Sequence, residues 1–200
     1  MFLEENPSPK EHAAWLHPAI GRMLVSAKIT AEHLQAVAVS AGPGSYTGLR
    51  VGMAAAKGLC FALKIPLITV GTLQLMADAM VASAREKKAL ICPMIDARRQ
   101  EVFTALYSAK MEEILPPRAL ILDKTSFEQY LSAGPVIFSG SGMEKWKTIN
   151  SSGQAIYMSQ NDVNESFAKI SNRFFAVKKW EDTAYAEPIY LKEFYTHAKN

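Results

Sequence analysis

Two kinds of apolar pattern alternate along the first half of the chain. Leu16, Ile20 and Leu24 are spaced as on one face of a helix, whereas Val37 and Val39 belong to a continuous apolar run typical of a buried strand. The alternation predicts, in order, a helix, a strand, a helix, a strand and a helix: residues 10–27, 34–42, 47–63, 65–72 and 72–85. Thr72 is the expected N-cap of the last helix. Strand, helix and strand in this order form a βαβ unit.

The second half predicts shorter elements. Two strand-like runs within residues 89–108 flank the polar turn from Asp96 to Gln100, which indicates a hairpin. A strand, a helix, a strand ending in a Gly-Ser-Gly turn and a last helix follow: residues 116–124, 126–133, 134–142 and 161–177. We therefore predict an α/β fold with an N-terminal lobe of residues 1–90 and a C-terminal lobe of residues 91–200.

Charge and cysteine content narrow the class of protein. A net charge of +3 on 200 residues is too small to predict nucleic-acid binding by itself. We interpret one loose basic region as solvated surface: Arg85, Lys87, Lys88, Arg98 and Arg99. Cys60 and Cys92 lie in apolar runs and are expected in the core rather than in a disulfide. The chain shows neither a signal peptide nor about 18 consecutive apolar residues, so we expect a cytoplasmic protein without membrane contact.

The stretch SAGPGSYTGLRVGMAAAKGL, residues 40–59, carries glycines that invite a phosphate-binding interpretation. It lacks the lysine and the spacing of a P-loop, and its glycines follow G-x-G-x-x-x-G instead of the dinucleotide pattern G-x-G-x-x-G. Ser45 is not flanked by the glycines of a nucleophile elbow. We interpret four residues as a structural turn between strand and helix: Gly42, Pro43, Gly44 and Ser45.

Gly48, Gly52 and Ala56 recur every four residues and share one face of the predicted helix. Each glycine inside a helix costs about 1 kcal/mol relative to alanine, so a packing requirement is expected to outweigh this cost. The face predicts a helix at close distance, and the spacing leaves open whether that helix belongs to the same chain or to a partner.

His12 and His17 are five residues apart and point roughly 140° away from each other, so they predict no metal site.

Five segments resemble, in matching order, the TsaB (YeaZ) family of bacterial tRNA threonylcarbamoyladenosine biosynthesis proteins, within the wider Gcp/Kae1-like (peptidase M22-like) group. The segments are EHAAWLHPAIGRML, the run from AVAVSAGPGSYTGLR to TLQLMA, MIDARRQEVFTALY, FSGSG and AEPIYLK. The element GPGSYTGLR is the most specific, and the segments together span most of the chain.

The resemblance implies an actin-like, Hsp70-like ATPase (ASKHA) fold of two related lobes. It also implies an inactive paralogue and scaffold subunit of the transferase TsaD, which with the ATPase TsaE places a threonylcarbamoyl group on the adenosine beside the anticodon of tRNA. The family pattern places ATP or ADP and metal on the partner subunits, assigns no cofactor to this chain, and has tRNA contacted through the complex. It leaves open a homodimer in the absence of a partner.

The same resemblance maps the pairing helices onto residues 11–25 and 47–63. The implied interface comprises His12, Leu16, Ile20, Gly48, Leu49, Gly52, Met53 and Ala56. Family members open with a strand carrying an Asp-Thr-Ser element, whereas this chain begins near the first helix with MFLEENPSPKEH. We therefore expect the first strands of the N-terminal lobe to be missing, and we favour a misassigned start over a fragment.

A small-molecule kinase with the same two-lobe fold is the alternative. The turn Ser139 to Gly142 would then face a nucleotide phosphate, and Asp96 would be the conceivable base. A kinase needs phosphate-binding turns from both lobes and a carboxylate that positions a metal, and the first such turn would lie in the N-terminal segment that we expect to be missing. The scaffold is therefore the favoured interpretation.

Overall fold

The computed structural model describes residues 2–6, 8, 11–86, 88–159 and 162–192. Lys10, Lys87 and Asn161, which belong to the expected helices and to the basic region, lie outside these residues. The chain forms two compact units. The first comprises Met1–Val70 and Lys169–Pro188, and the second comprises Gly71–Ala168 and Ile189–Asn200.

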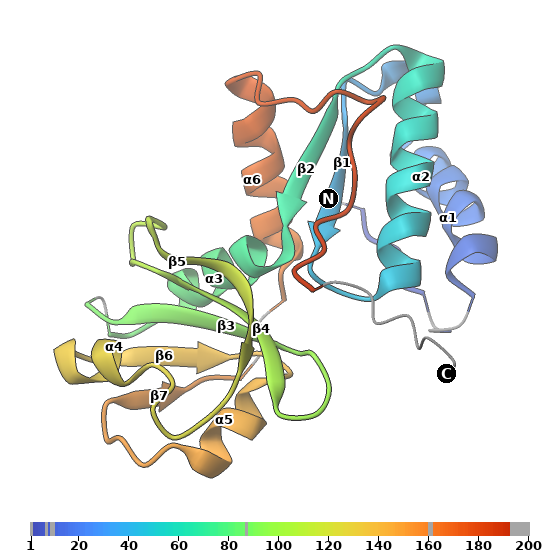
Figure 1. Ribbon diagram of the computed structural model, residues 1–200. Coiled ribbons are helices and arrows are strands. Elements are labelled where there is room, and N and C mark those ends of the chain that lie inside the picture. Colours follow the sequence, from blue (N-terminus) through green and yellow to red (C-terminus); the bar gives the residue numbers. More distant parts are fainter. Residues whose placement is uncertain (1, 7, 9–10, 87, 160–161, 193–200) are drawn as a thin grey trace, which may run out of the picture. The chain divides into compact units, whose positions relative to one another are not determined.

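The first unit begins with α1 (His12–Ala27) and a short 3₁₀ helix (Ala31–His33), followed by the expected βαβ unit. β1 (Val37–Gly42) and β2 (Leu67–Gly71) lie side by side with their arrows in the same direction, and α2 (Tyr46–Leu63) connects them (Figure 1).

A late segment of the chain completes this unit. Leu67 of β2 forms an antiparallel bridge with Glu181, and the hydroxyl of Thr69 donates a 2.8 Å hydrogen bond to the Glu181 carboxylate. Lys57 of α2 donates to the carbonyl oxygens of Ala184 and Ala186 at 3.1 and 3.0 Å. The buried cluster of the first unit draws on all of these segments: Ala41, Met53, Ala56, Cys60, Leu67 and Ala186.

The second unit is built on a mixed sheet of five strands in the order β5-β4-β3-β6-β7. The elements are α3 (Thr72–Ser83), β3 (Leu90–Asp96), β4 (Glu101–Tyr107), β5 (Glu113–Ile121), α4 (Glu128–Ala133), β6 (Val136–Ser139), α5 (Met143–Ile149) and β7 (Ala155–Tyr157). β3, β4 and β5 form an antiparallel meander, whereas β6 pairs in parallel with β3 and β7 in parallel with β6. The last helix, α6 (Asn164–Ala176), begins in the second unit and ends in the first.

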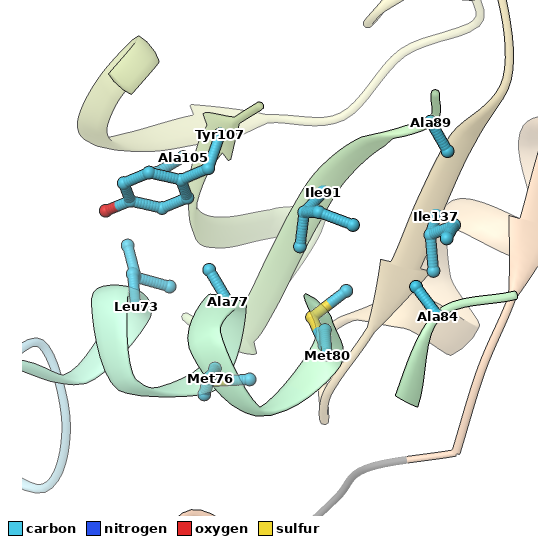
Figure 2. Packing of buried hydrophobic residues seen from close by; sticks show 10 residues of the cluster. All are labelled: Leu73, Met76, Ala77, Met80, Ala84, Ala89, Ile91, Ala105, Tyr107 and Ile137. Carbon is cyan, nitrogen blue, oxygen red and sulfur yellow. The ribbon is translucent and has the colours of Figure 1, made fainter. Parts of the chain in front are cut away.

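Both faces of this sheet are covered, because apolar residues alternate between them along each strand. On one face Leu73, Ala77 and Met80 of α3 point toward the strands (Figure 2). The strand residues of that cluster are Ile91, Ala105, Tyr107 and Ile137. On the other face the Phe127 ring meets the rings of Phe138 and Trp146 edge-on, with centroids 5.5 and 5.3 Å apart.

Several details differ from the sequence-based expectations. Gly71, not Thr72, is the N-cap of α3, and Thr72 is its first helical residue. α5 and β7 have no counterpart among the predicted elements, since each is short and α5 buries only Trp146. The compact units also divide the chain differently from the expected lobes 1–90 and 91–200, because α3 packs on β3 in the second unit.

Candidate interaction site on the first two helices

The glycine-rich turn after β1 sets the direction of α2. Gly42 has a φ of 108°, a left-handed conformation that favours glycine. Ser45 is the N-cap of α2, and its hydroxyl accepts a 3.4 Å hydrogen bond from the Gly48 amide. Gly42 and Pro43 are buried, whereas Gly44 and Ser45 are exposed. The turn therefore links the buried end of β1 to a helix whose first residues face solvent.

The inward side of α2 carries three of the eight residues that the sequence assigned to a partner. A Cβ on Gly52 would lie 3.6 Å from Cγ2 of Val39 in β1. Met53 and Ala56 are 3% and 4% exposed in the cluster around Leu67. The surface that Gly52 and Ala56 leave without long side chains thus receives the chain's own strand. Gly48 and Leu49, at the start of the helix, are half-buried.

The outward arc of α2 consists of Arg50, Ala54, Gly58 and Phe61, all exposed. Phe61 is 83% exposed, and a Cβ on Gly58 would have nothing within 4 Å. Ala54 and Gly58 each follow an inward small residue by two positions, a rotation of about 200° around the helix. This second set of small residues was visible in the sequence, but the periodicity alone did not say which of the two sets faces outward.

α1 packs beside α2 and shows the same division (Figure 1). Its inward side contains buried Ala19, with Leu16 and Ile20 half-buried beside it. Its outward arc consists of Ala14, Pro18, Gly21 and Val25, of which Val25 is 78% exposed. His12 is half-buried, with its Nδ1 3.4 Å from the side-chain amide of Asn6.

The Gly-Ser-Gly turn in the second unit owes its glycines to packing. Gly140 has a φ of 105°, and a Cβ there would lie 2.2 Å from the carbonyl oxygen of Met94. A Cβ on Gly142 would lie 2.7 Å from Cγ1 of Val102. Both glycines therefore allow the turn to lie directly on β3 and β4, a role that requires no phosphate ligand.

Asp96, the conceivable base of a kinase, is held as a carboxylate. Its Oδ1 accepts hydrogen bonds from Nζ of Lys145 at 2.8 Å and from the amide of Arg98 at 2.6 Å. The Lys145 hydrogen bond first, and then the Arg98 amide, lower the pKa of Asp96 below its ordinary value. A carboxylate with a lowered pKa is a poor general base near neutral pH.

Cysteine chemistry and metal binding find little support in the described residues. Burial raises the pKa of Cys92 to about 12 and also raises that of Cys60, so both remain thiols at neutral pH. Among the residues that the structure describes, no three His, Cys, Asp or Glu side chains come together as a metal site. None of the described helices is long and apolar enough to cross a membrane.

A polar hollow of about 330 Å³ lies in the second unit, and two of its lining side chains are hydrogen-bonded to residues outside the lining. It is lined by Lys124, Ser126, Glu128, Leu131, Ser132, Asn150, Ser151 and Ser152. The Ser126 hydroxyl donates to the Asp123 carboxylate, and the Asn150 amide donates to the hydroxyl of Tyr157. The first bond lies in the turn before α4, and the second joins the C-cap of α5 to β7.

The comparisons with known proteins show which family the chain belongs to. The sequence model of the family described as TsaD, tRNA N6-adenosine threonylcarbamoyltransferase, matches residues 7–188. The chain belongs to this family. Within the TsaD family, the resemblance to TsaB, also called YeaZ, is confirmed by the relatives described next.

Two curated relatives are both named tRNA threonylcarbamoyladenosine biosynthesis protein TsaB. The Bacillus subtilis protein is 36% identical over 116 residues, which are 56% of this chain and 49% of that protein. The Escherichia coli protein is 28% identical over 197 residues, which are 92% of this chain and 82% of that protein. The chain thus matches about half the length of the first relative and most of the second.

Two solved structures confirm the α/β class of the fold. A Pseudomonas aeruginosa protein described as similar to peptidase YeaZ superposes with a TM-score of 0.79 at 23% identity, covering 94% of this chain and 87% of that one. YeaZ from the same organism gives a TM-score of 0.71 at 22% identity, covering 90% of this chain and 85% of that one. These likenesses establish the fold.

Proposed function

We propose that this chain is a non-catalytic partner subunit in the formation of N6-threonylcarbamoyladenosine in tRNA, beside the anticodon. It pairs with a TsaD transferase and acts together with TsaE in the cytoplasm. The TsaB relatives, whose names place them in this biosynthesis, support the process. Asp96 is paired with Lys145, and Cys60 and Cys92 are buried, so these three groups are poorly placed to act as a base or a nucleophile, in keeping with a scaffold role.

We further assign the two units to the lobes of an actin-like (ASKHA) fold. The TM-score of 0.79 to a YeaZ-like structure and the βαβ unit of the first unit support this assignment. In the described residues of the first unit the sheet has two strands, β1 and β2.

The outward arc of α2 carries the proposal for the pairing surface. Phe61 exposes 83% of its surface, and burial of such a side chain is worth about 1.5–3 kcal/mol. Ala54 and Gly58 precede it on the same face and let a partner helix approach closely. Val25 on α1 offers a second exposed apolar side chain. An exposed aromatic residue beside small residues fits a helix-to-helix interface.

The residues first assigned to the interface keep a supporting role in this proposal. His12, Leu16, Ile20, Gly48 and Leu49 are half-buried, so each retains surface for the margin of the contact. The inward residues are Gly52, Met53 and Ala56. They hold α2 on its own sheet and so determine which way its outward arc faces.

The test compares two exposed aromatic residues of the first unit. Phe61→Ser is expected to weaken binding to purified TsaD at least tenfold, measured by titration calorimetry, with an unchanged thermal midpoint. Tyr185→Ser is the matched control, because Tyr185 is 82% exposed and lies outside both helices. Wild-type affinity of Phe61→Ser, or equal loss in Tyr185→Ser, would show that pairing uses another surface.

The scaffold role has its own measurement. The chain alone, with threonylcarbamoyl-AMP and unmodified tRNA, is expected to give no modified adenosine, and addition of TsaD and TsaE is expected to start the reaction. Transfer by the purified chain with TsaD rigorously excluded contradicts the proposal, because the chain would then be the catalyst.

A further inference from the structure

Two arginines occupy the tip of the β3–β4 hairpin in a conformation that arginine rarely adopts. Arg98 has a φ of 68° and Arg99 a φ of 47°, and both are exposed. The left-handed region costs a residue with a side chain roughly 1–2 kcal/mol, and glycine or asparagine is the usual choice in a hairpin turn. The hairpin therefore presents two guanidinium groups at a position where other residues would fold with less strain.

The neighbouring carboxylates are already paired with lysines. Asp96 accepts from Lys145 at 2.8 Å, and Glu101 forms an ion pair with Lys192. Neither arginine side chain makes a hydrogen bond or ion pair within the part of the chain that the structure describes. Four cations thus face two anions at the hairpin tip, and the two guanidinium groups carry the unmatched charge.

This cluster is separate from the other basic residues of the sequence. Arg85 and Lys88 precede β3, whereas Arg98 and Arg99 follow it. A strand of seven residues places its ends roughly 20 Å apart. The basic region expected from the sequence is therefore two sites, and only the site at the hairpin combines left-handed backbone with paired acids.

We propose that Arg98 and Arg99 bind the phosphate backbone of structured RNA. A guanidinium group binds phosphate through two parallel hydrogen bonds. The turn sequence DARRQE contains no aromatic residue for stacking on a base, so its contacts go to the backbone. The choice of RNA as the polyanion rests on the proposed function, in which tRNA is the substrate of the complex.

Fluorescently labelled tRNA transcript, titrated with the purified chain at several salt concentrations, tests the proposal. Arg98→Glu/Arg99→Glu is expected to weaken binding at least tenfold and to reduce the slope of log affinity against log salt by about 1 to 2, as for two lost phosphate contacts. Arg85→Glu/Lys88→Glu is the matched control with the same change in net charge. It is expected to bind within threefold of the wild-type chain.

Four results overturn the inference: no binding of the transcript by the wild-type chain, no effect of Arg98→Glu/Arg99→Glu on that binding, equal weakening in both double variants, or equally tight binding of duplex DNA of the same length. Binding of each variant to TsaD is measured in parallel. Normal TsaD pairing with no effect of Arg98→Glu/Arg99→Glu on tRNA rejects the RNA contact and leaves the proposed function standing. Failure of the wild-type chain to pair with TsaD rejects the proposed function instead.

Discussion

Gly52 of α2 lies against Val39 of β1, so that a Cβ on the glycine would come within 3.6 Å of Cγ2 of the valine. That distance is an ordinary contact for one methyl group, and a longer, branched side chain adds atoms beside Val39. The small residues Gly52 and Ala56 on this side of α2 therefore pack against the chain's own sheet. Gly58, two positions beyond Ala56, has open space in front of it.

Leucine substitutions at the two glycines are expected to have opposite effects. Gly52→Leu overpacks the contact with Val39 and should lower the free energy of unfolding by about 1–3 kcal/mol. Gly58→Leu should leave it unchanged or raise it by up to about 1 kcal/mol, because leucine favours the helix and meets no neighbour. Urea unfolding of both variants measures the difference.

The same pair also tests the pairing surface. Gly58→Leu is expected to weaken TsaD binding while its stability is kept, because the new side chain stands on the outward arc. If Gly52→Leu has normal stability but binds TsaD weakly, the result would show that TsaD binds the inward side of α2.

Lys145→Met is expected to raise the pKa of Asp96 toward its ordinary value near 3.8, because the strongest hydrogen bond to the carboxylate is lost. In the wild-type chain the folded pKa is lowered. The stabilisation is therefore present above the ordinary pKa and is lost as the pH falls through the lower folded value. A pH titration followed by carboxyl-carbon NMR measures this. Lys147→Met, also in α5, is the control and should leave Asp96 unchanged.

Alkaline pH is expected to destabilise the second unit through Cys92. Burial raises its folded pKa to about 12, against 9.0 ordinarily, so between these values the folded state binds more protons than the unfolded state. Stability must then fall as the pH rises, by up to about 1.4 kcal/mol per pH unit for this group. Urea unfolding between pH 8 and 11 should show a shallower decline for Cys92→Ala. Part of the decline is expected to remain in this variant, because burial also raises the pKa of Tyr107 to about 12. An identical slope in Cys92→Ala contradicts this account.

Gly140→Ala is expected to disrupt the turn after β6. Its φ of 105° and the 2.2 Å approach of a Cβ to the Met94 carbonyl leave no position for a methyl group. We expect a loss of about 3 kcal/mol or more in unfolding free energy. Gly153→Ala, where a Cβ meets nothing within 4 Å, is the control and should change stability by less than about 1 kcal/mol. If Gly140→Ala and Gly153→Ala have similar free energies of unfolding, the packing explanation for Gly140 is wrong.

The larger elements could be predicted from the sequence because the spacing of their apolar residues follows the side of each element that is buried. Leu16 and Ile20 share the partly buried side of α1, and the run around Val39 forms β1. The direction of α2 was not predictable in the same way, since small residues stand on two sides of this helix and either set allows close packing. Trp146 gave no signal of α5 because one buried residue in seven defines no period.

The discontinuous course of the first unit has a consequence for synthesis on the ribosome. β2 is complete at Gly71, yet the residues that bridge it and hold Lys57 lie between 181 and 186. At about 5–20 residues per second, the ribosome needs on the order of ten seconds to reach them. During that interval the sheet of the second unit emerges in full. The first unit, although its N-terminal part is synthesised first, is therefore the last unit to be completed. Its βαβ segment has to remain unaggregated until Glu181 has been synthesised and can pair with β2.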